Sequence, residues 1–212
     1  MTLWAIVPVK PLRRGKSRLS KVLSENERTI LNQNMLVNTI KILSSVNRID
    51  NILVVSRDPA ALTLAREYGA RTVLEDGSPE LNTALSRARL VAKTYRVNEI
   101  LILPADLPLL SREELERVLE QSGNPPEVLI CPDRQNDGTN LLYINPEGLI
   151  NFCYGSGSFN KHLELAKKSG ARINIIASNS LGLDLDTPED LELLKELQEK
   201  NKLLIENEWR LL

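Results

Sequence analysis

The chain has 212 residues, of which 42% are hydrophobic and 26% charged, a composition typical of one soluble globular domain and too apolar for a disordered protein. Its 27 basic and 28 acidic residues give a net charge of −1, which argues against a nucleic-acid-binding protein, because such proteins are usually basic. The apolar runs are too short for a membrane span or a signal peptide, and Cys131 and Cys153 lack metal-ligand spacing, so we expect a cytoplasmic protein with both thiols reduced.

The first half of the chain alternates strand-like and helix-like segments. The short apolar run 3–9 is rich in strand formers and predicts a buried first strand. Ser24 and Glu27 form a capping-box pair that predicts the start of a long helix. The apolar face of that helix is expected to comprise Ile30, Leu36, Val37, Ile40 and Leu43. Further strands are predicted at 51–56 and 71–74, and further helices from Asp58-Pro59 and from Ser78-Pro79.

The second half continues the alternation. Strands are predicted at 100–103, at 127–132, within 137–144, at 172–176 and at 181–186. Helices are predicted at 112–121 behind a second capping-box pair (Ser111 and Glu114), at 158–170 with Gly170 as the C-cap, and from Thr187-Pro188 onward.

This order of elements predicts an α/β fold with a single doubly wound, mostly parallel sheet and a hairpin-like insertion near 133–144. Residues 1–200 are interpreted as one domain and 201–212 as a C-terminal tail. The tail would pack either on the domain or on a second subunit, and in the second case the protein would be a homodimer. In such folds ligands bind beyond the carboxyl ends of the strands, where Lys10, Ser56 and Asp106 fall, together with Asp184 or Asp186.

A basic loop follows the first strand. It contains Lys10, Arg13, Arg14, Lys16 and Arg18 and lacks both the G-x-G-x-x-G and the Walker A patterns, which disfavours a Rossmann dehydrogenase or a P-loop NTPase. Its position at a strand end favours contact with phosphates, because Lys and Arg are their usual protein partners. The alternative is a solvated loop, and Arg13 and Arg14 fit that description best.

Carboxylates occupy two other strand ends. Asp106 follows one strand, while Asp184 and Asp186 alternate around Leu185 and so point to one side of an extended segment. Two separate carboxylate-bearing ends favour a divalent cation, and Mg²⁺ binds one or two carboxylates together with substrate phosphates. Asp186 is alternatively a helix cap before Thr187. The basic loop and a Mg²⁺ site together predict a nucleoside triphosphate site.

Two clusters of small residues, 137–140 (DGTN) and 154–159 (YGSGSF), are candidates for a second anion site. The second cluster precedes a helix that begins near Ser158, and backbone N–H groups at such a start bind anions. The alternatives are an ordinary hairpin turn and an ordinary N-cap. The only histidine, His162, lies on this helix and would touch a phosphate or pack internally, and we do not expect it to act as a general base.

The motifs VPVKPLRRGKSRL, LPADLPLL, DGTN, YGSGSF and LDLDTPEDL occur in an order and spacing that resemble the CofC/FbiD guanylyltransferases of coenzyme F-420 biosynthesis. The resemblance spans roughly residues 3–194 and implies a MobA-like nucleotidyltransferase fold. It implies that GTP and Mg²⁺ are used and that GMP is transferred to the phosphate of phosphoenolpyruvate or 2-phospho-L-lactate, or of 3-phosphoglycerate in a variant, with release of pyrophosphate.

The resemblance also implies roles for individual residues. Catalysis would depend on Lys10, Lys16 and Arg18. Nucleotide binding would involve Lys10, Lys16, Ser17, Arg18, Asn82 and Asp106. The acid substrate would contact Thr139, Gly155 and Ser158, and the metal would bind Asp106, Asp184 and Asp186. Some relatives carry an acidic residue where this chain has Ser156 or Gly157, so the acid pocket differs in detail.

Three rival interpretations remain. A molybdopterin- or sugar-phosphate-specific nucleotidyltransferase of the same fold usually has a glycine-rich first loop, which this chain lacks. A glycosyltransferase would carry its D-x-D motif in mid-chain and not beside the last helix. A non-catalytic GTP sensor would bind GTP without releasing pyrophosphate.

Overall fold

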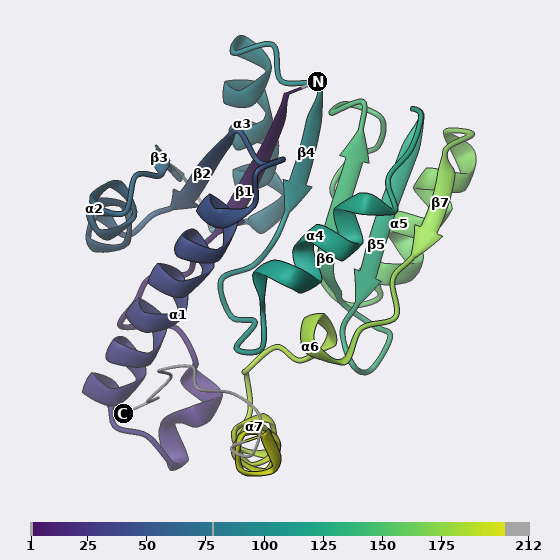
Figure 1. Cartoon of the computed structure of the whole chain (residues 1–212). Helices are drawn as coiled ribbons and strands as arrows, with labels where there is room; N and C mark the ends of the chain where they lie inside the picture. The colour runs from purple at the N-terminus through teal and green to yellow at the C-terminus, as the bar shows by residue number, and fades with distance from the viewer. Residues whose placement is uncertain (1, 78, 202–212) are drawn as a thin grey trace.

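A computed structural model describes residues 2–77 and 79–201 (Figure 1). The strands are β1 (Leu3–Pro8), β2 (Asn51–Ser56), β3 (Arg71–Leu74), β4 (Glu99–Ile102), β5 (Glu127–Pro132), β6 (Thr139–Asn145) and β7 (Arg172–Ile175). They form one seven-stranded sheet in the order β3-β2-β1-β4-β6-β5-β7. Only β6 runs antiparallel to its neighbours, β4 and β5, so the predicted mostly parallel α/β sheet with a hairpin after 132 is confirmed.

Helices cover both faces of the sheet. They are α1 (Glu25–Ser45), α2 (Pro59–Glu67), α3 (Leu81–Thr94), α4 (Arg112–Glu120), α5 (Ser158–Lys168), α6 (Asn179–Gly182), α7 (Pro188–Asn201) and the 3-10 helix η1 (Ser17–Lys21). In Figure 1, α1 and α4 lie on the viewer's side of the sheet, and α3 and α5 lie behind it. The arrangement is therefore doubly wound, and the carboxyl ends of the parallel strands share one edge.

The five inner strands are buried on both faces, because their residues alternate between two hydrophobic cores, whereas the edge strands β3 and β7 are partly exposed. In β1, Leu3, Ala5 and Val7 join the core beneath α1, α2 and α4, while Trp4 and Ile6 join the core beneath α3 and α5. This double burial explains why the inner strands, such as β1 and β2, are largely continuous apolar runs in the sequence.

A third hydrophobic cluster lies beyond the strand ends, and we call it the clamp cluster. Its buried members are Leu19, Leu31, Met35, Leu183, Leu185, Leu191 and Leu194. They come from η1, from the first half of α1, and from α7 with the segment before it. The C-terminal helix is thus packed against the basic loop that follows β1, which fixes that loop in place.

The long helix α1 begins with the predicted capping box, since Ser24 accepts from Glu27 N and the Glu27 carboxylate accepts from Ser24 N. Its predicted apolar face is partly wrong. Ile30 is 48% exposed and Val37 is only partly buried, whereas Leu31 and Met35 are buried. The reason is that the N-terminal half of α1 packs on the clamp cluster and not on the sheet. Its buried face therefore contains Leu31 instead of the neighbouring Ile30.

Two other predictions of local structure need correction. Helix α3 begins at Leu81 with Glu80 as its cap, because the Glu80 carboxylate accepts from Asn82 N and Thr83 N, so Pro79 precedes the helix by two residues. The run 181–186 is not a strand. Its first two residues end α6. In the following segment Leu185 N donates to Asp106 O at 3.0 Å, a contact with the loop after β4 and not part of a strand ladder.

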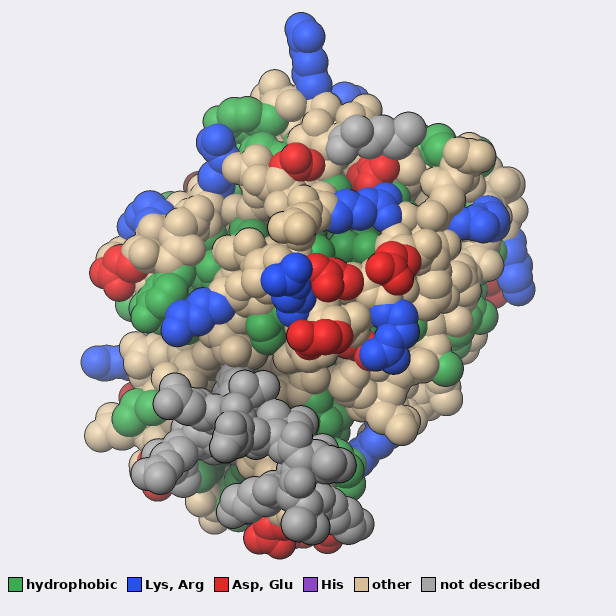
Figure 2. All heavy atoms as spheres, viewed as in Figure 1, with side chains coloured by type: hydrophobic (Ala, Val, Ile, Leu, Met, Phe, Trp, Pro, Cys, Tyr) green, Lys and Arg blue, Asp and Glu red, His purple; other side chains and the backbone are tan. Residues whose placement is uncertain are grey.

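The outer surface of α4 is charged. Figure 2 shows acidic and basic side chains intermixed over this helix, and ion pairs join Arg112 to Glu116 at 2.8 Å and Arg117 to Glu114 at 3.3 Å. Within 2–77 and 79–201, none of the helices is both long enough and apolar enough to cross a membrane. The predicted tail 201–212 lies, apart from Asn201, outside the described residues.

Candidate active site

A cavity of about 520 Å³ opens at the carboxyl ends of the strands. One wall is the basic loop, represented by Lys10, Gly15 and Lys16. The opposite wall comes from the β5–β6 hairpin and the start of α5, and its lining includes Thr139, Asn140, Gly155 and Ser158. Asp106, Asp184 and Asp186 lie in the lining between them. The fold therefore brings most of the predicted site residues into one cavity.

The basic loop is held rigidly by polar contacts. Leu12 N donates to the Asp58 carboxylate at 2.8 Å, and Asn32 Nδ2 donates to the carbonyl of Leu12 at 2.7 Å. A Cβ at Gly15 would lie 2.7 Å from the Asn32 amide, so a larger residue there would displace the side chain that holds Leu12. Lys16 follows in the left-handed region, with φ 57° and ψ 38°, which turns its side chain back into the cavity.

Lys16 makes two ion pairs inside the cavity. Its ammonium donates to Asp106 at 2.7 Å and to Asp186 at 2.8 Å, and its side chain is only 5% exposed. Burial alone would lower the pKa of Lys16, but the two carboxylates outweigh burial and raise that pKa above its ordinary value. Lys16 is therefore a fixed positive charge in contact with two of the three predicted metal ligands.

Asp184 has a different environment from Asp186. Its carboxylate accepts a long hydrogen bond, 3.4 Å, from Asn140 Nδ2 and forms no ion pair with a described residue. Burial and then the nearby charge of Asp106 raise the pKa of Asp184. For Asp186, burial acts in the same direction, yet the adjacent Lys16 ammonium outweighs it and lowers the pKa. Asp184 and Asp106 are therefore a pair of like charges that a cation would stabilise.

The alternative role of Asp186 as a helix cap is not observed. Thr187 caps α7 instead, because Asp190 N donates to the Thr187 hydroxyl at 3.3 Å and the Asp190 carboxylate accepts from Thr187 N at 2.8 Å. This reciprocal box leaves the carboxylate of Asp186 free to bind Lys16. Across residues 2–77 and 79–201, no three His, Cys, Asp or Glu side chains are arranged to hold a metal by themselves.

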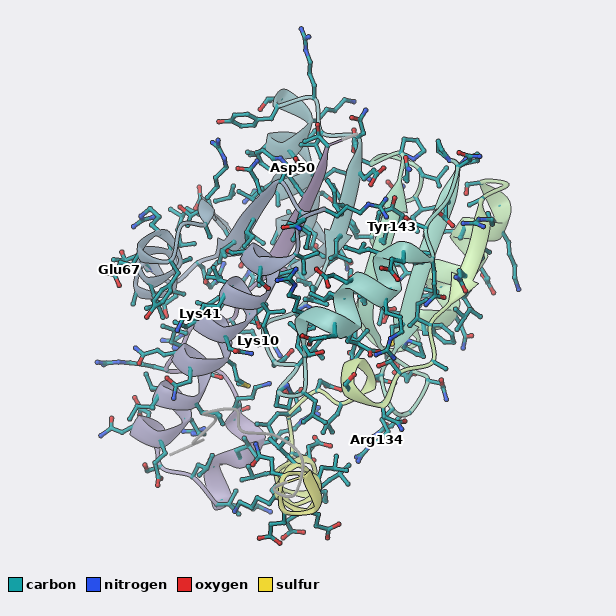
Figure 3. The ribbon with its side chains drawn as sticks, in the orientation of Figure 1. Lys10, Lys41, Asp50, Glu67, Arg134 and Tyr143 are labelled. Atoms are coloured by element: carbon teal, nitrogen blue, oxygen red, sulfur yellow. The ribbon has the colours of Figure 1, made fainter. Side chains whose placement is uncertain are left out.

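The other predicted cationic residues lie at the rim. Lys10 is exposed at the end of β1 and lines the cavity (Figure 3). Ser17 and Arg18 are exposed on η1, outside the lining residues. Both Lys10 and Arg18 lie close enough to Asp186 for their charges to contribute to its lowered pKa. Their contacts with a nucleotide stay predictions.

The predicted nucleotide contact Asn82 has protein partners on both sides of its amide. Its Nδ2 donates to Glu80 at 2.9 Å and to the carbonyl of Tyr154 at 3.2 Å, and its Oδ1 accepts from Tyr154 N at 2.7 Å. Asn82 is not among the lining residues of the cavity. It braces the segment that leads to Gly155, and direct contact with a nucleotide stays a prediction.

The start of α5 differs from its predicted role as a free anion site. Asp137 accepts from Gly157 N through its carboxylate and from Phe159 N through its carbonyl, both at 3.0 Å, and Ser158 N donates to Gly155 O. These amides are therefore already satisfied within the protein. Gly155 has φ +118°, and no heavy atom lies within 4 Å of the place a Cβ would take, so the backbone angle and not space requires glycine.

Hydroxyl groups and the histidine form the inner part of this wall. Ser158 Oγ donates to Thr139 Oγ1 at 3.3 Å, and His162 Nδ1 lies 3.0 Å from the same Thr139 oxygen. All three side chains are buried. Burial and then the charge of Lys161 lower the pKa of His162 to about 4, so the ring is neutral at pH 7.

Two residues that shape the site had little signal in the sequence. Asn140 donates to the carbonyls of Leu181 at 2.9 Å and Gly182 at 3.2 Å, and so positions the segment that carries Asp184. Asp137 caps α5 from 20 residues earlier. Both belong to the DGTN motif, which the sequence marked as a turn or an anion site but whose Asp137 and Asn140 were given no individual role.

Comparisons with known proteins agree with this geometry. The family described as guanylyl transferase CofC like matches residues 3–201. A phosphoenolpyruvate guanylyltransferase of Rubrobacter xylanophilus is 40% identical over 92% of this chain and 94% of its own length. A 2-phospho-L-lactate guanylyltransferase of Methanocaldococcus jannaschii is 38% identical over 88% of this chain and 79% of its own.

Solved structures share the fold. A nucleotidyl transferase from Methanothermobacter superimposes with a TM-score of 0.67 at 16% identity, covering 94% of this chain and 99% of its own. At this level of identity the likeness concerns the fold, and it agrees with the predicted nucleotidyltransferase architecture.

Proposed function

Because the chain belongs to the CofC-like guanylyl transferase family, we propose that it transfers GMP from GTP to a phosphorylated three-carbon acid in coenzyme F-420 biosynthesis. The acid is phosphoenolpyruvate or 2-phospho-L-lactate, the substrates in the names of the two relatives. One observation carries the proposal: a single cavity joins a lysine–carboxylate cluster to a wall of buried hydroxyls.

The reaction suits a site without a nucleophilic side chain. A phosphate oxygen of the acid attacks the α-phosphorus of GTP, the bond from that phosphorus to the β-phosphate oxygen breaks, and pyrophosphate leaves with the electron pair. The attacking oxygen is already anionic, so no general base is needed. The barrier is dominated by bringing two anions together, which positioning and charge neutralisation lower.

We assign the triphosphate to the wall that carries Lys10 and Lys16. Lys16 is buried, rigid and positively charged, so it requires no reorganisation to stabilise charge on the leaving pyrophosphate. Lys10 and Arg18, exposed at the rim, would contact phosphates on arrival and departure. The acid is assigned to the opposite wall, with Thr139, Gly155 and Ser158.

Mg²⁺ fits the donor set between the two walls. Asp106 and Asp184 would supply oxygen ligands. Burial and then the charge of Asp106 raise the pKa of Asp184, and a divalent cation would relieve both effects. We propose these two as the principal ligands, with Asp186 held mainly by Lys16. When bound, Mg²⁺ supplies positive charge against the phosphate oxygens.

One panel of assays tests the proposed function. Each of phosphoenolpyruvate, 2-phospho-L-lactate and 3-phosphoglycerate is mixed with the protein, Mg²⁺ and GTP, and pyrophosphate is measured. We expect release with one of the first two acids and little with ATP in place of GTP. Equal release from ATP contradicts guanylyl specificity. GTP binding without pyrophosphate in every mixture indicates a nucleotide sensor and contradicts the enzyme.

A further inference from the structure

His162 is buried beside the cavity, and both of its ring nitrogens are engaged. Nε2 lies 2.9 Å from the backbone N–H of Cys153, and Nδ1 lies 3.0 Å from Thr139 Oγ1. The ring also packs edge-on against Tyr154, with centroids 4.9 Å apart and planes at 69°. Its orientation is therefore fixed from three sides.

These contacts determine which nitrogen carries the hydrogen. A backbone N–H can only donate, so Nε2 must accept from Cys153 and cannot be protonated. The hydrogen of the neutral ring is then on Nδ1, and Nδ1–H donates to Thr139 Oγ1. The usual ambiguity between the two tautomers is removed by a single main-chain donor.

The hydroxyl of Thr139 is thereby saturated as an acceptor. Its oxygen receives one hydrogen bond from His162 and a second from Ser158 Oγ at 3.3 Å, which uses both lone pairs. No residue in 2–77 or 79–201 accepts the hydrogen of Thr139. This hydroxyl lines the cavity, so its remaining hydrogen has only an occupant of the cavity as a partner.

We infer that His162 is a positioning residue that makes Thr139 an obligate hydrogen-bond donor to an anionic oxygen of the acid substrate. The inference rests on the proposed function for the identity of the acid, and it adds the reason why a neutral imidazole stands behind the hydroxyl. A hydroxyl that can only donate favours a carboxylate or phosphate oxygen and disfavours a ligand that presents a hydrogen there.

Three variants of His162 separate its two hydrogen bonds. His162→Asn keeps a donor near the position of Nδ1 and loses the acceptor for Cys153. His162→Gln keeps a group near Nε2 and loses the donor to Thr139. His162→Leu removes both. We expect the KM for the acid to rise about tenfold in the Gln and Leu variants, the scale of one hydrogen bond, and clearly less in the Asn variant.

A second pair of variants tests the hydroxyl itself. Thr139→Ser retains the donor, whereas Thr139→Val is close to isosteric and lacks it. Because the acceptor is charged, the valine variant should raise the acid's KM or its calorimetric Kd by roughly 10- to 100-fold, with the serine variant near wild type. In both series the KM for GTP should stay within about twofold, a split that general loss of structure would not produce.

The tautomer is measured without turnover. His162 is the only histidine in the chain, so protein labelled with ¹⁵N-histidine gives one imidazole signal set. We expect the Nδ1–H tautomer in the free protein at pH 7. The Nε2–H tautomer overturns the inference, as does an equal rise in the acid's KM for the Asn and Leu variants, or an unchanged acid affinity in Thr139→Val.

Failure of the proposed function is distinguishable from failure of this inference. If wild-type protein releases no pyrophosphate with any acid, the function is wrong. The inference is then decided by the imidazole spectrum together with calorimetric binding of phosphoenolpyruvate and 2-phospho-L-lactate to wild type and Thr139→Val. If the histidine variants do not fold, the Thr139 pair and the wild-type spectrum still decide it.

Discussion

Lys16→Met should destabilise the protein and convert its lysine–carboxylate cluster into a proton- and metal-sensitive site. The substitution keeps an unbranched side chain of similar length and removes the positive charge. Asp106 and Asp186 then lose their ion pairs at 2.7 and 2.8 Å, with Asp184 nearby as a third carboxylate. The remaining negative charges repel one another in a partly buried space.

The magnitude follows from burial. Removing one partner of a buried ion pair costs roughly 3–5 kcal/mol, because a buried charge is left uncompensated. Here the lysine side chain is 5% exposed, but those of Asp106 and Asp186 are 26% and 30% exposed, so solvent screens part of the loss. We expect about 3 kcal/mol or less at pH 7, equivalent to a decrease in Tm of at most roughly 6–12 °C for a chain of this size.

The pH dependence has a definite sign. In wild type the lowered pKa of Asp186 contributes stability above its unfolded pKa, and this contribution is lost as pH falls through the folded pKa. In Lys16→Met the lysine charge that lowers the pKa of Asp186 is lost, while the burial that raises this pKa remains, so we expect the variant to be penalised most at pH 7. The deficit in unfolding free energy should shrink as pH falls from 7 toward 4.

Thermal and urea unfolding of wild type, Lys16→Met and the exposed control Lys21→Met measure these effects. Lys21→Met should remain within about 0.5 kcal/mol of wild type. Adding Mg²⁺ should raise the Tm of Lys16→Met more than that of wild type, because the cation replaces the missing charge. A variant as stable as wild type at pH 7, with an unchanged pH profile, would refute the electrostatic reasoning.

Three further predictions concern neighbouring residues. Asp184→Asn should fold normally, lower turnover by at least ~10²-fold in pyrophosphate-release assays and abolish stabilisation by Mg²⁺ in thermal unfolding, whereas retention of both contradicts its role as a ligand. Gly155→Val places a β-branched residue at φ +118°. It should raise the KM for the acid strongly and change the affinity for GTP little; the opposite result would mean that GTP and the acid bind at each other's proposed walls. The pKa of His162, about 4 in the fold against 6.5 for the free side chain, predicts that His162 lowers the unfolding free energy by up to about 3 kcal/mol from pH 6.5 to pH 4. Urea unfolding of His162→Asn should show a smaller loss over this range by that amount.

The inner strands were predictable because strands buried on both faces require continuous apolar runs, and β1 and β2 match the predicted runs closely. The capping box of α1 was predictable because it is a local pattern of four residues. The buried face of α1 was not, since Leu31 and Met35 are buried by α7, which lies more than 150 residues away in sequence. Local periodicity carries no information about such a distant partner.

In the candidate site, too, some features were predictable from the sequence and others depended on contacts between distant residues. The position of Lys16 after the first strand indicated a role near phosphates. Its ion pairs with residues 90 and 170 positions away required the fold. From the sequence, Asp186 could be either a metal ligand or a helix cap. The structure excludes the cap, because Thr187 and Asp190 hydrogen-bond to each other's backbone N–H at the start of α7. The role of Asp137 depended likewise on the packing of the hairpin against α5.

The clamp cluster has a consequence for how the protein is made. Domains usually fold as units while the chain is synthesised from its N-terminus at roughly 5–20 residues per second. Leu19 and Leu31 leave the ribosome early, whereas their partners Leu191 and Leu194 belong to the last helix. A nascent chain that ends before residue 186 therefore lacks these last leucines, exposes Leu19 and Leu31, and leaves Lys16 without Asp186. The basic loop reaches its final form only when synthesis is nearly complete, so an enzyme truncated before residue 186 has its sheet but not its charge cluster.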